Sequence, residues 1–310
     1  MKILVTGGSG LVGMALQEVL KNTEYIVLTP SSKECNLIDS QETLSYIERH
    51  QPDFIIHLAA KVGGLYKNMN DKVTMFEENM KINMNVLECA YRCRIKKVIS
   101  CLSTCIFPDQ LHFPIDEDML HNGPPHVSND AYAYAKRMLE IQSRIYNEQY
   151  GTHFICVIPT NIYGPNDNFS LEDGHVIPSL IHKCYLAKEE GKEFVVRGTG
   201  KPLRQFIFSK DLAKLIRWVL ENYIEKKSII LSVSEKDEVT IGDIAYEIAK
   251  NFDYQDHLVF DNSYSDGQYK KTANNSKLLS YLPNFHFVST KDGIKQTVEW
   301  FIKNYETIRK

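Results

Sequence analysis

The feature that most constrains this sequence is a glycine-rich loop close to its first residue. Gly7, Gly10 and Gly13 have Gly-x-x-Gly-x-x-Gly spacing, directly after the apolar and β-branched run at residues 2–6. A strand, a glycine turn and a helix in this order let the backbone approach a diphosphate, and the helix N-terminus attracts the anion. An isolated glycine motif would indicate only a tight turn, whereas this context predicts a dinucleotide-binding unit. The residues expected at the cofactor are Gly7, Gly8, Ser9, Gly10, Leu11, Val12 and Gly13.

The first half of the chain alternates short apolar runs with longer amphipathic stretches. The runs are typical of buried parallel strands; they lie at residues 2–6, 25–28, 54–58, 97–102 and 153–158. The stretches between them have helical length and spacing, at residues 14–21, 43–50, 80–92 and 132–149. This rhythm predicts an α/β fold with a Rossmann-type doubly wound parallel sheet.

After about residue 160 the rhythm breaks into loops rich in Asn, Asp, Gly and Pro. A helical stretch at 177–188 and a strand-like piece at 194–196 indicate a smaller C-terminal α/β substrate domain, while 211–223 and 228–233 look like a helix and strand returning to the first domain. We therefore predict a dinucleotide-binding domain at 1–165, joined by 206–235. The substrate domain would comprise 166–205 and 236–310.

Charge and composition exclude several classes of protein. Acidic and basic residues nearly balance, at 39 against 36, so the chain has no overall field for holding nucleic acid or an anionic membrane. No apolar run approaches the roughly 20 residues that span a bilayer, and the N-terminus lacks the apolar region of a secretory signal. Seven cysteines, several in apolar runs, are expected to be reduced thiols. We predict a cytoplasmic protein without a metal site.

The end of the second predicted strand distinguishes NAD from NADP. NAD sites usually place an acid there, which accepts a hydrogen bond from the ribose 2′-hydroxyl. Here Leu28 is followed by Thr-Pro-Ser-Ser-Lys, so Ser32 and Lys33 stand where a 2′-phosphate would lie. These residues favour NADP, and Glu34 is the residue that argues for NAD.

Tyr132 and Lys136 form a Tyr-x-x-x-Lys pair, and the four-residue step places both on one helix face. A lysine charge beside the phenol is expected to lower the tyrosine pKa, and such a tyrosine can protonate a carbonyl oxygen that receives hydride. Ser103, at the end of the fourth predicted strand, could hydrogen-bond the same oxygen. The trio predicts carbonyl reduction, with an ordinary solvated helix face as the alternative.

Cys105 and His175 are two further candidate catalytic residues, for which spacing alone is less specific. Cys101, Ser103 and Cys105 have the same parity, so they would project to one face if the strand continues that far. Cys105 would then lie at the carboxyl edge of the sheet, where doubly wound folds bind ligands. Spacing alone leaves open whether Cys105 is a catalyst or a buried inert cysteine. His175 taken alone is typical of a loop histidine.

Longer stretches of the chain resemble the GDP-L-fucose synthase family of extended short-chain dehydrogenases/reductases. The glycine loop and the Tyr-x-x-x-Lys pair belong to the broad superfamily, whereas other motifs are more specific. The specific motifs are Val62-Gly63-Gly64, Ser103-Thr104-Cys105 and Gly174-His175-Val176. Further matching stretches lie at 57–64, 103–108, 159–161, 164–169, 175–178 and 265–271, so the likeness covers almost the whole chain.

The resemblance implies a bifunctional enzyme, an oxidoreductase and isomerase. It would epimerise C3 and C5 of GDP-4-keto-6-deoxy-D-mannose and then reduce the C4 ketone with NADPH. Cys105 would be the base and His175 the acid of epimerisation, while Ser103 and Tyr132 would hold the enolate oxygen and assist the reduction. Lys136 would bind the nicotinamide ribose. Besides Ser32 and Lys33 at the second strand end, the cofactor contacts expected from the resemblance are Cys101, Leu102, Ser103, Thr104, Pro159, Thr160, Asn161, Ile162 and His175. The substrate contacts it implies are Lys183, Arg204, Asp266 and Lys271.

The sequence departs from the family at two positions. Arg197 stands where the family commonly has tryptophan, and Asn166 replaces a usual histidine. Alternative functions are another nucleotide-sugar epimerase or dehydratase of the same fold, or a catalytically silent NADP-binding regulator. The family also implies a homodimer that pairs through the helices predicted at 80–92 and 132–149.

Overall fold

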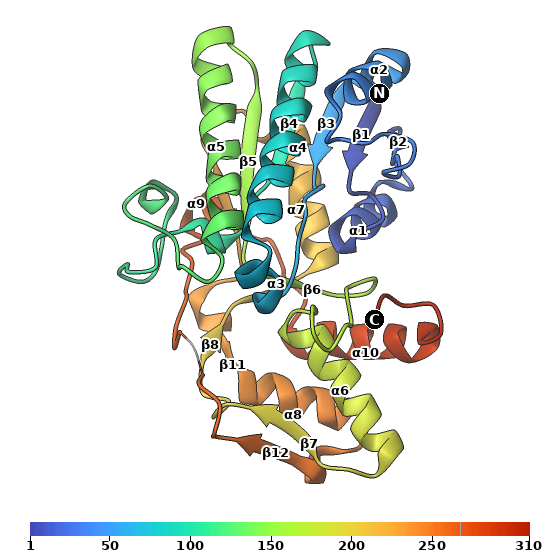
Figure 1. Cartoon of the computed structure of the whole chain (residues 1–310), viewed down its shortest axis with the longest axis vertical. Helices are drawn as coiled ribbons and strands as arrows, with labels where there is room; N and C mark the ends of the chain where they lie inside the picture. The colour runs from blue at the N-terminus through green and yellow to red at the C-terminus, as the bar shows by residue number, and fades with distance from the viewer. Residues whose placement is uncertain (267) are drawn as a thin grey trace.

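A six-stranded parallel sheet forms the upper part of the molecule (Figure 1). The computed structural model describes residues 1–266 and 268–310. The strand order is β10-β5-β4-β3-β1-β2. The bounds are β1 Lys2–Thr6, β2 Ile26–Leu28, β3 Phe54–His57, β4 Lys97–Cys101, β5 Phe154–Pro159 and β10 Ile229–Leu231. Every residue of β4 and β5 is buried, as continuous apolar runs between two helical layers require.

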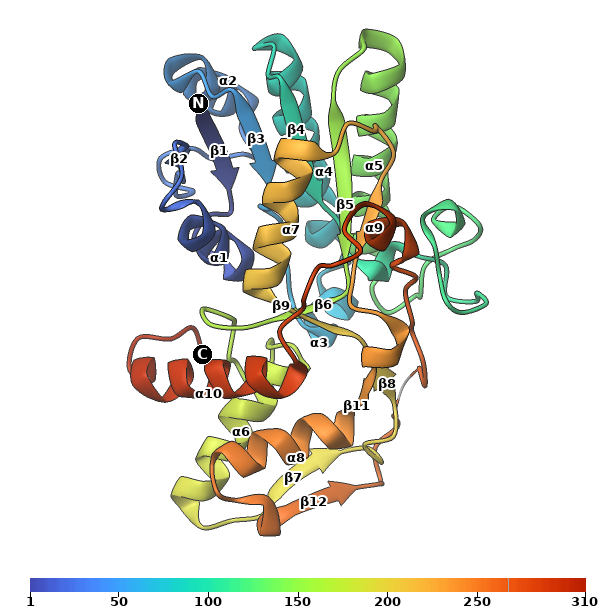
Figure 2. The ribbon, with the colours of Figure 1, turned by 180° about the vertical axis from the view of Figure 1, so that it is seen from behind.

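Helices cover both faces of this sheet. On one face α1 (Leu11–Leu20) packs with α7 (Ser209–Asn222), and their leucines share a core with alternate residues of the strands (Figure 2). The opposite face carries α2 (Ser40–His50), α4 (Lys72–Arg92) and α5 (Asp130–Tyr150). The short helix α3 (Leu65–Asn70) precedes α4. The predicted doubly wound parallel sheet is confirmed.

A second core lies below the sheet in both views. Its elements are α6 (Val176–Glu190), β7 (Phe194–Arg197), α8 (Ile241–Asn251), β12 (Leu258–Asp261) and α10 (Thr290–Asn304). Strands β7 and β12 pair in parallel. Helix α8 begins with a capping box: Thr240 Oγ1 accepts from the Asp243 amide at 2.9 Å, and Asp243 accepts from the Thr240 amide at 3.0 Å.

The remaining short elements of the described residues are strands β6, β8, β9 and β11, helix α9 and 3-10 turns η1 to η4. Strand β6 (Asn161–Tyr163) pairs with β9 (Phe206–Phe208) in parallel, and β8 (Leu203–Arg204) pairs with β11 (Val239–Thr240) in antiparallel orientation. Helix α9 is Ser276–Tyr281. The 3-10 turns are η1 Thr104–Ile106, η2 Glu117–Met119, η3 Glu235–Asp237 and η4 Gln255–His257.

The chain crosses between the two parts more than once. Strand β10 pairs in parallel with β5 at the edge of the main sheet. Leu278 of α9, with Phe285 and Phe287, packs against the sheet core, although the sequence assigned 236–310 to the substrate domain. The division into two domains stays a proposal, and this packing argues for assigning residues 276–287 to the first domain.

Candidate active site

The glycine loop lies between β1 and the N-terminus of α1, beside the point where the strand order reverses. The Gly10 amide donates to the Gly7 carbonyl at 3.0 Å, which closes the turn. Gly7 has a φ of +73°, and a Cβ there would lie 2.8 Å from the Ala59 nitrogen. A Cβ on Gly13 would lie 2.5 Å from the Gly7 carbonyl oxygen. The loop is therefore a bare backbone cradle at a helix N-terminus, which suits a diphosphate.

The loop after β2 carries Ser32 and Lys33, and both side chains are exposed. Glu34 turns back onto its own loop, where its carboxylate accepts hydrogen bonds from the amide and hydroxyl of Ser31, each at 2.8 Å. These bonds lower the pKa of Glu34. The acid that argued for NAD is thus bound to Ser31, while Lys33 stays available for a 2′-phosphate.

Tyr132 and Lys136 lie on one face of α5, with the lysine Nζ 5.9 Å from the centre of the tyrosine ring. Lys136 is buried and donates to the Cys101 carbonyl at 2.9 Å. The lysine was expected to lower the tyrosine pKa, but burial raises the pKa of Tyr132 well above its ordinary value, and negative charge on Cys105 or Cys101 would add to this. The phenol therefore keeps its proton and is available as a proton donor.

Ser103 and Cys105 lie just beyond β4, which ends at Cys101. The condition for all three side chains to project from one strand face is not met, because β4 ends at Cys101 and the chain turns into the 3-10 helix η1. Ser103 caps this turn, and its Oγ accepts from the Cys105 amide at 3.4 Å. Cys105 is partly buried and lies near enough to Tyr132 for a charge on one to affect the other. The turn thus brings the serine, the cysteine and the tyrosine to the same edge of the sheet.

The remaining cofactor candidates follow the adjacent strand ends. Thr160 Oγ1 lies 3.2 Å from Ser232 Oγ, and Asn161 Nδ2 donates to the Gln205 carbonyl at 2.9 Å. Strands β4 and β5 are neighbours in register, so the segments after them lie at one carboxyl edge. These residues are Leu102, Thr104, Pro159, Thr160, Asn161 and Ile162.

His175 is the N-cap of α6, and its side chain reaches the surface. The protein around it lowers its pKa through desolvation. The loop before it packs against a second family-specific motif: a Cβ on Gly64 would lie 3.1 Å from the Cα of Asp173. Val62-Gly63-Gly64 and Gly174-His175-Val176 are therefore neighbours in space. Within the described residues, no hydrogen bond joins His175 to Cys105.

Three substrate candidates lie at the junction with the lower part. Arg204 donates to the Leu203 and Gln268 carbonyls, each at 2.7 Å. Asp266 accepts from the amide and hydroxyl of Thr199, each at 2.6 Å, so here it braces the 198–200 loop. Burial lowers the pKa of Lys271, and the charges of Cys105 and Arg204 act on it. Lys271 and Arg204 thus extend the site from Cys105 towards the lower part.

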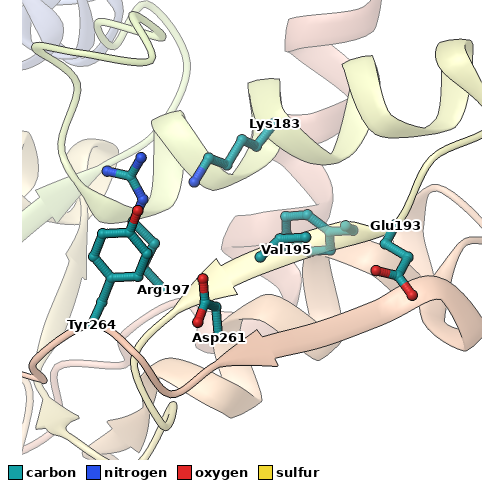
Figure 3. A pocket seen from close by; sticks show the side chains of 7 residues that line it. Lys183, Glu193, Val195, Arg197, Asp261 and Tyr264 are labelled. Atoms are coloured by element: carbon teal, nitrogen blue, oxygen red, sulfur yellow. The ribbon is translucent and has the colours of Figure 1, made fainter.

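Lys183 belongs to a separate cavity between α6 and the β7/β12 sheet (Figure 3). Its ammonium points towards Arg197, whose guanidinium lies 4.6 Å from the centre of the Tyr264 ring. Burial, with the charge of Arg197, lowers the pKa of Lys183. The sequence had noted Arg197 only as a departure from the family, and it did not bring out Tyr264.

Sequence reasoning also missed a buried polar chain behind the catalytic helix. His57 Nδ1 lies 2.8 Å from Thr6 Oγ1, and His57 Nε2 lies 3.1 Å from Asn83 Oδ1. Asn83 Nδ2 donates to the Ala135 carbonyl, one residue before Lys136, at 3.3 Å. Desolvation, with the charge of Lys136, lowers the pKa of His57 to about 3, so it is neutral. An asparagine on the inward face of an amphipathic helix was the signal that could have revealed this chain.

The part of the chain that the structure describes contains no group of three or more His, Cys, Asp or Glu that could hold a metal ion. Across the same residues, none of the helices combines the length and the apolar character needed to cross a membrane.

A glycine cradle, a Tyr-Lys pair and a strand-end serine at one edge of a doubly wound sheet define a short-chain dehydrogenase/reductase. The NAD dependent epimerase/dehydratase family matches residues 3–233. The chain is 53% identical to a GDP-L-fucose synthase of Dictyostelium discoideum, over 99% of this chain and 97% of that one. It is 47% identical to a probable GDP-L-fucose synthase of Drosophila melanogaster, over 100% and 99% of the two chains.

Solved structures agree with these relatives. A GDP-L-fucose synthetase from Naegleria fowleri bound to NADP superposes with a TM-score of 0.97, at 49% identity, covering 100% of this chain and 95% of that one. The chain belongs to the GDP-L-fucose synthase branch of the NAD dependent epimerase/dehydratase family.

Proposed function

We propose that the chain is a GDP-L-fucose synthase, which converts GDP-4-keto-6-deoxy-D-mannose to GDP-L-fucose with NADPH. The observation that carries this proposal is the grouping of Ser103, Cys105 and Tyr132 beside Lys136. A simple reductase needs the tyrosine, the lysine and the serine, but it has no use for a cysteine next to them. The names of the relatives point to the same reaction.

NADPH suits the residues present. The glycine cradle accepts a diphosphate, and Lys33 is exposed beside a Glu34 that is already held by Ser31. When bound, the cofactor supplies the hydride for C4 of the sugar. Lys136 is expected to hold the nicotinamide ribose, because its ammonium lies at the end of β4 at the carboxyl edge of the sheet.

In the reduction, Tyr132 donates the proton to the C4 oxygen. Burial keeps the phenol protonated, and Ser103 Oγ provides a second hydrogen bond to the same oxygen. The carbonyl carbon gains a hydride and the oxygen gains a proton, so the ketone becomes an alcohol.

In the epimerisation, Cys105 removes the proton from C3 or C5, and the electron pair moves onto the C4 oxygen as an enolate. Ser103 and Tyr132 stabilise this oxygen. His175 then returns a proton to the opposite face of the carbon. Lys271 lies near enough to Cys105 for the two side chains to interact electrostatically.

The test is NADPH consumption with GDP-4-keto-6-deoxy-D-mannose, followed by stereochemical assignment of the sugar product. GDP-L-fucose as product would support both activities. Reduction without inversion at C3 and C5 would contradict the bifunctional proposal. NADPH binding without consumption would favour the silent regulator.

We also propose that the protein is a cytoplasmic homodimer. The seven cysteines are all free, which fits a reducing compartment. Exposed apolar side chains on α4 and α5 support pairing through these helices.

A further inference from the structure

The cavity that contains Lys183 lies outside the group around Tyr132 and Cys105. Its volume is about 310 Å³, and α6 forms its roof while β7 and β12 form its floor (Figure 3). The chemically distinctive residues that line it are Lys183, Glu193, Val195, Arg197, Asp261 and Tyr264.

The alternation of side chains along β7 and β12 determines which residues face the cavity. Val195 and Arg197 are the exposed residues of β7, between the buried Phe194 and Val196. Arg197 is in register with Asp261 of β12, so both side chains point to the same face. The floor therefore offers an apolar valine with a cation and an anion beside it.

Arg197 and Tyr264 close one end of the cavity. The guanidinium lies 4.6 Å from the centre of the Tyr264 ring, within the range of a cation–π contact. A guanidinium is planar and stacks on aromatic rings. The pair thus supplies a flat wall at the position where the family commonly has a tryptophan.

Asp261 is held in one orientation. Its Oδ1 accepts from the Ser263 amide at 3.0 Å and from the Ser263 hydroxyl at 2.6 Å. These bonds, with the charge of Arg197, lower the pKa of Asp261, so it is ionised. In Figure 3 the carboxylate rises from β12 into the cavity, whereas Glu193 lies at the opposite end. Oδ2 accepts no hydrogen bond from the residues that the structure describes, and each carboxylate oxygen has two acceptor sites.

We propose that Asp261 selects guanine in the substrate, with the base lying on Val195 and against the Arg197–Tyr264 wall. This inference rests on the proposed function, because it takes the substrate to be a GDP-sugar. Guanine carries two adjacent donors, N1–H and the 2-amino group, and the two free acceptor sites of Asp261 Oδ2 can accept both of them. Adenine has an acceptor at N1, and the single N3–H of uracil lies between two carbonyl oxygens that a carboxylate repels. Lys183 is on the roof, where its charge suits the diphosphate.

The test is calorimetric binding of GDP, UDP and inosine diphosphate, which lacks only the 2-amino group, in the presence of NADP. The wild type is expected to bind GDP about tenfold or more tightly than inosine diphosphate, the size expected for a hydrogen bond to a charged group. Asp261→Asn should remove this preference. Glu193→Gln, an equal change of charge in the same cavity, should keep it.

Arg197→Ala should weaken the binding of GDP and of inosine diphosphate by the same factor, because stacking of the base on the wall does not depend on the 2-amino group. Unchanged NADPH binding in each variant would show that the fold is intact. A GDP preference that survives in Asp261→Asn, or a wild type that binds UDP as tightly as GDP, would overturn the inference. If the preference depends on Asp261 but the keto-sugar is not turned over, the nucleotide assignment stands and the proposed reaction fails.

Discussion

Tyr132 and Cys105 lie in the same site, and the proposed mechanism gives them different roles. Tyr132 donates the proton in the reduction. Removing the phenol hydroxyl in Tyr132→Phe should lower NADPH consumption by about 100-fold or more, the usual size of a general-acid contribution. Solvent deuterium should still enter C3 and C5, more slowly, because Ser103 remains to stabilise the enolate. The measurement is NADPH oxidation beside deuterium uptake by mass spectrometry. An unchanged oxidation rate would exclude Tyr132 as the proton donor.

The reverse pattern is expected for Cys105. Cys105→Ser replaces the thiol with a hydroxyl that is far harder to deprotonate, so deuterium uptake should fall about 100-fold or more. NADPH affinity should stay the same, because Cys105 is not part of the glycine cradle. If Tyr132→Phe and Cys105→Ser lost NADPH binding to an equal extent, the division of roles between them would be wrong.

The acid role of His175 predicts a particular pH dependence. Desolvation lowers its pKa from 6.5, so its protonated form is lost as the pH rises through a value below 6.5. Deuterium uptake by the wild type should therefore decline with rising pH in this range. Tyr132 keeps its proton throughout, because its pKa is raised. This decline of deuterium uptake with rising pH should be absent in His175→Gln and present in Tyr132→Phe. A decline that survives in His175→Gln would show that another group titrates.

At the residue scale, the sequence identified groups by spacing and could not give their surroundings. The Tyr-x-x-x-Lys step was enough to place Tyr132 and Lys136 on one face. The predicted direction of the Tyr132 pKa shift was wrong, because burial of the phenol raises its pKa. The link from His57 to Asn83 joins segments 26 residues apart, and no local pattern encodes such a pairing.

At the scale of elements, the loop at 164–175 carries a buried acid. Asp167 is 5% exposed, and its Oδ2 has no hydrogen-bond partner within the described residues. Burial raises the pKa of Asp167 from 3.8 to about 7. The loop also holds the C-terminal residues, since the Phe169 amide donates to the Arg309 carbonyl at 2.9 Å.

Asp167→Asn should therefore stabilise the protein in a pH-dependent way. A raised pKa in the folded state favours folding below the unfolded pKa of 3.8, and this advantage is lost as the pH rises through about 7. The gain from asparagine should grow from pH 5 to pH 8, up to about 4 kcal/mol at most, which a melting-temperature series would detect. Asp237→Asn, on an exposed side chain, is the control. A gain that does not depend on pH would contradict the buried charge.

The sequence predicted long elements better than short ones. The central strands β4 and β5 are buried on both faces, so they appear as largely apolar runs. Helix α4 begins at Lys72, eight residues before the predicted stretch, because its first turns have a less regular apolar pattern. Strands β6, β8, β9 and β11 have two or three residues each and depend on pairing with distant segments.

At the scale of the whole molecule, the proposed site needs both cores. The glycine cradle, Tyr132 and Cys105 come from the upper sheet, whereas His175 and Lys183 come from α6 below it. The contact of Gly64 with Asp173 joins the two parts close to His175. A relative shift of the parts would therefore change the distance from His175 to Cys105 without changing either core.

Exposed apolar side chains on the outer faces of α4 and α5 are the basis for expecting a homodimer. Val73, Phe76 and Met84 on α4 are 69%, 38% and 49% exposed, and Ile145 on α5 is 44% exposed. Their exposure places them on the outer faces of the two helices, and water contact with such side chains is unfavourable. The wild type should therefore sediment as a dimer of the 35.7 kDa chain.

Met84→Glu combined with Ile145→Glu should produce monomers, because pairing would bury four new carboxylates without partners. The control is Ile224→Glu, at an 84% exposed isoleucine just after α7, which should leave the dimer intact. Analytical ultracentrifugation distinguishes the species, and NADPH binding reports that the fold is preserved. A wild type that sediments as a monomer, or a double variant that still sediments as a dimer, would show that this face does not mediate pairing.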